Sequence, residues 1–131
     1  KLKLFHKAST FSFNNRVKIG KRYTKIASYY ERKGYLVIIS VMALSKKVFK
    51  FNRLQIKTYH EIFLNVPLTE LKRRDPKKIY EKFRLGKIRN VAGLDLKIDR
   101  PKNPGLLINW KKGMSKSFIS NKLKKYFYKF H

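Results

Sequence analysis

The chain has 131 residues, of which 34 are Lys or Arg and 7 are Asp or Glu, so its formal net charge is +27. Hydrophobic residues make up 43% of the chain and aromatic residues 15%, which excludes a disordered polycation and predicts a buried core. Cysteine is absent, which excludes disulfides and thiolate-bound zinc, and His6, His60 and His131 have no metal-ligand spacing. We therefore expect no cofactor and no metal, and a polyanionic partner such as nucleic acid.

The first predicted element is an amphipathic helix at the start of the chain. Apolar residues between 1 and 15 follow the i, i+3, i+4, i+7 spacing of a helix, and Asn14 and Asn15 are expected to end it. A short extended piece over 16–20 should lead into a second helix over 21–33, where apolar residues share one face. The chain is thus expected to open with two helices separated by an extended piece.

Gly34 supplies the left-handed residue that commonly ends a helix, and two strand-like segments follow it. The segments 35–44 and 48–59 are rich in β-branched and aromatic residues, and residues 45–47 interrupt the pattern. Together they predict a hairpin. The apolar run 35–44 is about half as long as the roughly 20 residues that a membrane-crossing helix needs, so it is predicted to be a buried strand.

The stretch 61–90 is predicted to be a linker that carries a short helix. Pro67 excludes a regular central strand, and Asp75 followed by Pro76 is a good helix start. A short apolar stripe then precedes Gly86. The linker is therefore expected to contribute little to the core.

The last third of the chain is predicted to contain two strands and a helix. The segment 91–98 alternates as a strand does, and residues 100–105 include two prolines and a glycine that force a turn. A second strand is expected over 106–110. From Ser115 onward, apolar residues fall near helical spacing and lysines fill the other positions, which predicts a basic amphipathic helix.

Two segments about seventy residues apart carry a recognisable pattern. Lys21–Leu36 reads KRYTKIASYYERKGYL, with a Lys-rich start, an Ile-Ala pair and a Gly-aromatic-aliphatic end. Ile98–Lys112 reads IDRPKNPGLLINWKK, with an Ile-x-Arg start and a Pro-Gly turn. Both segments, in this order, resemble the small-ribosomal-subunit protein eight family. The residues in matching places are Ile26, Ala27, Gly34, Tyr35, Leu36, Ile98, Arg100, Pro104, Gly105 and Ile108.

The resemblance implies an α/β (α+β) fold of two small lobes. An N-terminal α-β-α-β-β lobe would be followed by a reduced, mainly β second lobe and a basic C-terminal helix. The expected parts are an RNA-binding lobe over 1–60, an inserted linker over 61–90, a reduced β lobe over 91–112 and a basic helix or tail over 113–131. The family's later Ser-Thr-Ser-Lys-Gly loop, which contacts RNA, is not recognisable in this sequence.

The same resemblance implies a structural, non-catalytic protein of the small ribosomal subunit. It would bind helical RNA of the central domain through phosphate and shape recognition and support subunit assembly. The expected partners are small-subunit ribosomal RNA and neighbouring ribosomal proteins, with no membrane and no small-molecule substrate. Residues favoured by AT-rich codons are abundant, so the expected location is the mitochondrial matrix, in the mitochondrial ribosome, with the plastid ribosome as the alternative.

Cationic side chains and one Asn are the candidate RNA contacts. A helix N-terminus favours phosphate, a turn bracketed by prolines presents side chains rigidly, and the tail has no acid near its lysines. We expect the tail over 113–131 to anchor RNA in place of the missing loop. The candidate RNA-binding residues are Arg16, Lys18, Lys21, Arg22, Lys25, Arg100, Lys102, Asn103, Lys111, Lys112, Lys116, Lys122, Lys124 and Lys125.

Catalytic motifs are not found in the sequence. It contains no Walker loop, no G-x-G-x-x-G and no nucleophile elbow, so no catalytic residue is expected. Two other functions remain open. The chain could be a different lineage-specific organellar RNA-binding or ribosomal protein, or a basic membrane-surface protein that places 115–131 on anionic lipid.

Overall fold

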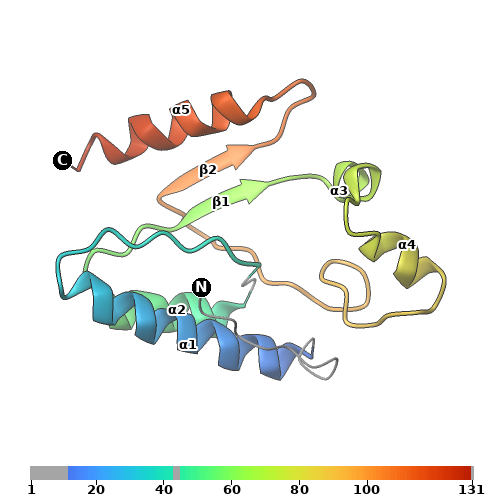
Figure 1. Cartoon of the computed structure of the whole chain (residues 1–131), viewed down its shortest axis with the longest axis horizontal. Helices are drawn as coiled ribbons and strands as arrows, with labels where there is room; N and C mark the ends of the chain where they lie inside the picture. Colours follow the sequence, from blue (N-terminus) through green and yellow to red (C-terminus); the bar gives the residue numbers. More distant parts are fainter. Residues whose placement is uncertain (1–11, 43–44, 131) are drawn as a thin grey trace. The chain divides into compact units, whose positions relative to one another are not determined.

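The computed structural model describes residues 12–42 and 45–130, which build a mixed α/β protein (Figure 1). The described residues form two compact units: 12–42 and 45–59 with 75–101, and 60–74 with 102–130. The mixed α/β class predicted from the sequence is confirmed, and the predicted lobes are not. The elements in chain order are α1 Phe13–Glu31, α2 Lys46–Gln55, β1 Ile62–Asn65, α3 Leu68–Arg74, α4 Ile79–Arg84, β2 Leu106–Asn109 and α5 Lys116–Phe127.

Helix α1 begins earlier than the sequence pattern indicated. Ser12 is its N-cap, and the Ser12 hydroxyl accepts a hydrogen bond from the Asn15 amide at 3.4 Å. The prediction that Asn14 and Asn15 end a helix is therefore wrong, as is the extended piece predicted over 16–20. Asn is tolerated in a first turn, and packing of the residues that follow overrides its preference for helix ends. The predicted first helix falls largely outside the described residues.

The hairpin predicted after α1 is also wrong. The end of α1 is as expected, with Gly34 in the left-handed region at φ +83°. Residues 35–42 then run extended but are paired to no other described strand, and 46–55 form helix α2 instead of a strand. The apolar residues Val48 and Phe49 are buried in α2. A short apolar run of this kind fits either a buried strand or one face of a helix, so the sequence pattern does not distinguish the two.

Helices α1 and α2 pack side by side through small side chains (Figure 1). Gly20 contacts Val48, which is only 2% exposed, and the Thr24 hydroxyl hydrogen-bonds the Asn52 side chain. The Ser28 hydroxyl donates to the Gln55 carbonyl at 2.8 Å. From one contact to the next, the residue numbers in α1 and in α2 increase in the same direction, so the two helices run parallel.

The second unit is organised around a pair of parallel strands. Ile62 of β1 lies opposite Leu106 of β2, and the pairing continues to Asn65 and Asn109. The prediction of 61–90 as a linker is wrong, because this stretch contains β1, α3 and α4. The partner of β1 is more than forty residues away, so no local pattern marks the pairing. The predicted short helix is confirmed as α4.

The later elements follow their local signals more closely. Strand β2 and helix α5 are both confirmed, and the Ser115 hydroxyl caps α5 by accepting from the Phe118 amide at 3.1 Å. The strand predicted over 91–98 is wrong, because this segment forms turns with one isolated bridge between Ala92 and Leu96. In the part of the chain that is described, no helix is long and apolar enough to cross a bilayer.

Helix α3 contains a buried carboxylate with two arginine partners. Glu70 is 6% exposed and accepts two hydrogen bonds of 2.8 Å from the Arg73 guanidinium and another from Arg74. The Arg74 guanidinium carbon lies 5.9 Å from the centre of the Trp110 ring. Hydrogen bonding from Arg73, together with Arg74, lowers the pKa of Glu70 to about 2 against the penalty of burial.

We expect the Glu70→Gln variant to differ from the parent chain in how its stability depends on pH. The lowered pKa means that ionised Glu70 stabilises the fold above about pH 4.5, and that this contribution is lost as the pH falls towards 2. Thermal unfolding curves at pH 7 should therefore show a lower midpoint for Glu70→Gln, and the two midpoints should converge near pH 2. Glu81→Gln, which removes an exposed pair with Lys78, is the control and should change little at either pH. A constant difference across the pH range would contradict the assignment.

Candidate functional site

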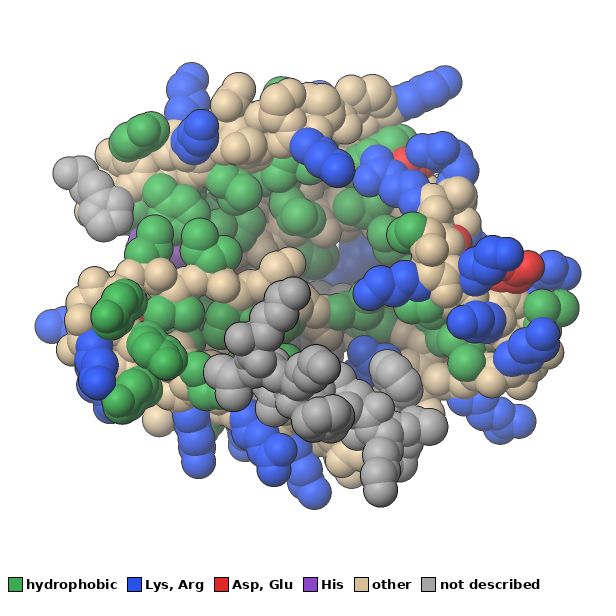
Figure 2. All heavy atoms as spheres, viewed as in Figure 1, with side chains coloured by type: hydrophobic (Ala, Val, Ile, Leu, Met, Phe, Trp, Pro, Cys, Tyr) green, Lys and Arg blue, Asp and Glu red, His purple; other side chains and the backbone are tan. Residues whose placement is uncertain are grey.

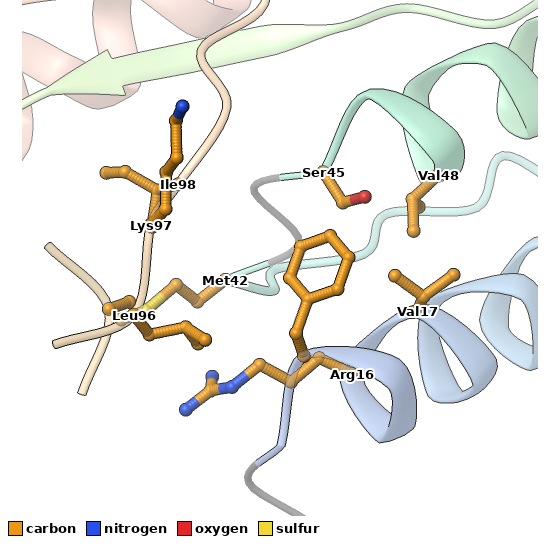
Figure 3. A pocket seen from close by; sticks show the side chains of 10 residues that line it. Arg16, Val17, Met42, Ser45, Val48, Leu96, Lys97 and Ile98 are labelled. Atoms are coloured by element: carbon orange, nitrogen blue, oxygen red, sulfur yellow. The ribbon is translucent and has the colours of Figure 1, made fainter. Parts of the chain in front are cut away.

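The first unit has a small pocket between the start of α1, the start of α2 and the loop over 91–98 (Figure 3). Most of its wall is apolar, and Arg16 and Lys97 are its two cationic members. The labelled side chains in Figure 3 come from these three segments and from the extended segment before α2. The lining residues are Phe13, Arg16, Val17, Met42, Ser45, Val48, Ala92, Leu96, Lys97 and Ile98.

Arg16 connects α1 to the loop beside the pocket. Its guanidinium donates a hydrogen bond of 3.0 Å to the Asn90 carbonyl. Partial burial lowers the pKa of Arg16, but a guanidinium stays protonated at neutral pH. The pocket therefore has a fixed positive charge at one side, while most of the other lysines and arginines lie exposed (Figure 2).

Ser45 provides a polar atom at the start of α2. The residue is 5% exposed, and its hydroxyl has no hydrogen-bond partner within the described residues. It occupies the N-cap position of α2 without capping the helix through its side chain. A buried hydroxyl normally has a hydrogen-bond partner. Because the Ser45 hydroxyl has none among the described residues, it is a candidate for hydrogen bonding to a bound molecule.

The loop beside the pocket is organised by Asp95. Its carboxylate accepts hydrogen bonds from the Asn90 amide at 2.8 Å and the Val91 amide at 2.6 Å. Burial by itself would raise the pKa of Asp95, but these backbone hydrogen bonds and nearby Arg89 lower it. Asn90 has φ +61° and Gly93 has φ +82°, so the chain turns back on itself here. Asp95 thus holds the residues that follow it against the pocket.

Replacing Asp95 by Ala should release the two amides that it holds. We expect hydrogen exchange at Asn90 and Val91 to become about 10- to 100-fold faster, because local opening no longer breaks two charge-assisted hydrogen bonds. Asp75→Ala is a matched control, since Asp75 accepts from the Ile79 and Glu81 amides at the start of α4. Unchanged exchange in Asp95→Ala, or equal acceleration in the control, would contradict this role.

The residues predicted to bind RNA lie on four separate segments. Of the predicted residues on α1, only Arg16 lines the pocket, and the other four are exposed. Arg100 lies at the end of the first unit, and Lys102 and Asn103 precede β2. Lys111 and Lys112 follow β2. The remaining predicted residues are exposed on α5: Lys116, Lys122, Lys124 and Lys125.

Most pocket residues were not predicted from the sequence. The sequence predicts Ser45 in the break of a hairpin and Lys97 in a strand, and neither is predicted to be a site residue. One local signal was present: Asn90, Gly93 and Asp95 are residues typical of a turn in which a carboxylate accepts backbone hydrogen bonds. That signal would have predicted the loop but not the pocket, which requires α1 and α2 to meet.

The pocket is small, with a volume of about 20 Å³, which is room for roughly one water molecule. It combines an apolar wall with a few polar groups, which suits a ligand that has an apolar ring and an anionic group. The adenylylsulphate kinase family model matches residues 3–109. The chain belongs to this family.

Individual proteins similar to this chain also support its membership of the family. The chain is 32% identical over 94 residues to a cytidine diphosphoramidate kinase of Campylobacter jejuni, covering 72% of this chain and 55% of the relative. It is 31% identical over 101 residues to an adenylyl-sulfate kinase of Pseudomonas aeruginosa, covering 76% and 52%. The Mycobacterium tuberculosis APS kinase CysC, solved with AMPPNP and APS, has a TM-score of 0.81 and 27% identity, covering 89% and 69%. The chain thus spans about half the length of the two curated kinases from Campylobacter jejuni and Pseudomonas aeruginosa.

These findings overturn the ribosomal interpretation. The resemblance to the small-ribosomal-subunit protein eight family is wrong, because the two short matched segments lie within or overlap the region that the kinase family covers. The relatives are phosphotransferases, so the prediction of a non-enzymatic structural protein is wrong, as are both alternatives to it. The prediction of ribosomal RNA and ribosomal proteins as partners is also wrong, and the similar Mycobacterium tuberculosis structure instead contains the small molecules AMPPNP and APS. The relatives named here are bacterial, and nothing supports a mitochondrial or plastid ribosome.

Proposed function

We propose that the chain binds the nucleotide substrate of a kinase similar to adenylyl-sulfate kinase. The observation that carries the proposal is the pocket of the first unit, which lies within the region matched to the family. The names of both relatives describe a kinase that acts on a nucleotide derivative, one of adenosine and one of cytidine. The chain spans about half of their length, so the proposal concerns substrate binding by these residues and not the whole phosphoryl transfer.

The pocket must open to admit a nucleotide, because its volume in this structure is about 20 Å³. Its lining then offers a contact for each part of that ligand. Phe13, Leu96 and Ile98 supply apolar surface for a base, and Arg16 supplies a fixed charge for a phosphate or sulfate group. The unpartnered Ser45 hydroxyl can hydrogen-bond a ribose or an anionic oxygen.

In phosphoryl transfer, enzymes contribute mainly by positioning the reactants and stabilising charge. A nucleotide held by an aromatic wall and a guanidinium would present its reacting hydroxyl in one orientation. The chain's share of the reaction is therefore to bind and orient the acceptor nucleotide. Asp95 contributes indirectly, because it holds the loop that supplies Leu96, Lys97 and Ile98.

The direct test is an NMR titration of the 131-residue chain with adenylyl sulfate. We expect shifts confined mainly to the pocket residues, and affinity at least about tenfold higher than for adenosine, which lacks the anionic group. The titration should be run at about 0.3 M salt, where nonspecific attraction to a chain of charge +27 is screened. Shifts spread over the exposed lysines, or equal affinity for inorganic pyrophosphate, would contradict a nucleotide site in this pocket.

A further inference from the structure

The pocket of the first unit is closed in this structure by the loop over 91–98. Because its volume is about 20 Å³, this loop must move before a nucleotide enters. Figure 3 shows Leu96, Lys97 and Ile98 on the opposite side of the pocket from Ser45 and Val48. The contacts that hold the loop in place therefore control access to the pocket.

Asp99, which follows the loop, connects it to the start of α2. The Asp99 carboxylate accepts a hydrogen bond of 2.8 Å from the backbone amide of Lys46, the first residue of α2. It also lies 3.8 Å from the Lys46 ammonium group. The Asp99 side chain is 24% exposed, so the contact is only partly open to water. Asp99 thus fastens the end of the loop to the helix.

The position that the Asp99 carboxylate occupies favours an anion. The first amides of a helix have no partner within the helix, and the helix dipole favours negative charge beside them. Helix α2 has no acidic residue in its own first turn, and the Ser45 side chain at its N-cap does not cap it. Asp99 therefore supplies, from a distant part of the sequence, the negative charge that this helix end lacks.

The Ser45 hydroxyl points to a ligand at the same helix end. Ser45 lines the pocket and is buried, and its hydroxyl has no hydrogen-bond partner among the described residues. Arg16, also in the wall, donates to the Asn90 carbonyl just before the loop. The Arg16 guanidinium and the Lys46 amide are thus both held by acceptors next to the loop. A sulfate or phosphate group has enough oxygens to replace the Asp99 carboxylate and also to accept from Ser45.

We propose that Asp99 is an internal competitor that keeps the pocket closed. A ligand with a sulfate or phosphate group opens the pocket by displacing the Asp99 carboxylate and accepting hydrogen bonds from the Lys46 amide and the Ser45 hydroxyl. Because Asp99 belongs to the same chain, it competes at a high local concentration, and the measured affinity falls with the fraction of molecules that are open. The inference rests on the proposed function for the identity of the whole ligand, whereas inorganic sulfate alone tests the competition.

The experiment is an NMR titration of the 131-residue chain with inorganic sulfate, at constant ionic strength, followed at the Lys46 amide. Asp99→Ala should bind sulfate about tenfold more tightly than the parent chain, because the competing carboxylate is gone. Asp75→Ala is the matched control, since it removes the same charge from an Asp that accepts from two amides at the start of α4. It should change the sulfate affinity by less than about twofold. No gain in Asp99→Ala, or an equal gain in the control, would overturn the proposal.

Asp99→Asn keeps an oxygen for the Lys46 amide and removes only the charge, so it tests the competition even if Asp99→Ala does not fold. Its sulfate affinity should lie between those of the parent chain and Asp99→Ala, and an affinity no higher than the parent's would contradict the role of Asp99. Sulfate should also shift the amides of 96–98, because the loop moves. Shifts at Lys46 without shifts at 96–98 would show that the anion binds without opening the pocket, which also overturns the proposal.

Adenylyl sulfate separates this proposal from the proposed function. If it binds no more tightly than inorganic sulfate while Asp99→Ala still gains sulfate affinity, the nucleotide site fails and the competition by Asp99 stands. If it binds tightly but the affinities of the parent chain and Asp99→Ala for both ligands are equal, the nucleotide site stands and the competition fails.

Discussion

The Gly20→Val variant should lower the free energy of unfolding by about 3 kcal/mol, because it overpacks the contact between α1 and α2. A Cβ atom at Gly20 would lie 2.9 Å and 3.1 Å from the two methyl carbons of Val48. Both residues are buried, and neither helix can move away without breaking the hydrogen bonds made by Thr24 and Ser28. Urea denaturation followed by far-ultraviolet circular dichroism measures the change.

Two further variants test whether packing is the cause. Lys25→Val adds the same side chain on the exposed side of α1 and should change stability by no more than about 0.5 kcal/mol. Val48→Ala alone should cost about 2 kcal/mol, because it leaves a cavity. In the Gly20→Val background, however, the same change should restore stability. Additive losses in the double variant would show that the two sites do not share the contact.

The Arg16→Ala variant should weaken binding of adenylyl sulfate by about 10- to 100-fold, which corresponds to the loss of one charge-assisted hydrogen bond. Arg16 is the cation of α1 that lines the pocket. Isothermal titration calorimetry at moderate salt measures the affinity. Binding of adenosine should fall much less, since the guanidinium is assigned to the anionic part of the ligand.

The matched control for this variant is Lys18→Ala. It removes the same charge two residues along α1 from an exposed position, and it should change the affinity by less than about twofold. Thermal unfolding of both variants shows whether the loss of the hydrogen bond to Asn90 disturbs the fold. Equal losses of affinity in Arg16→Ala and Lys18→Ala would mean that overall charge, not the pocket, attracts the nucleotide.

Elements with strong local signals were predicted well from the sequence. Helix α5 follows Ser115, whose hydroxyl caps it, and α4 follows Asp75, which accepts hydrogen bonds from two amides at the helix start. Gly34 adopts the left-handed conformation expected after α1. In each case the deciding contact lies within about six residues along the chain, so the pattern of nearby residues is sufficient.

Elements that depend on distant partners were predicted poorly. The segment 46–55 has residues that suit either a strand or a helix, and contact with α1 selects the helix. Strand β1 is a strand because it pairs with β2, which follows more than forty residues later in the chain. The pocket also depends on distant partners, because it exists only where α1, α2 and the loop over 91–98 meet. Of its lining residues, Arg16 is the one that the sequence predicts as a binding residue.

The sequence by itself determined the mixed α/β class and the apolar character of residues 35–42. It could not distinguish between anionic partners, because 34 cationic side chains attract a ribosomal RNA and a nucleotide alike. Only the tertiary structure brought Arg16, Ser45 and the loop ordered by Asp95 around one pocket. It also showed that most of the large side chains of residues 35–42 are exposed. Net charge and hydrophobic periodicity follow from the sequence alone, whereas a site depends on distances between residues that only folding brings together.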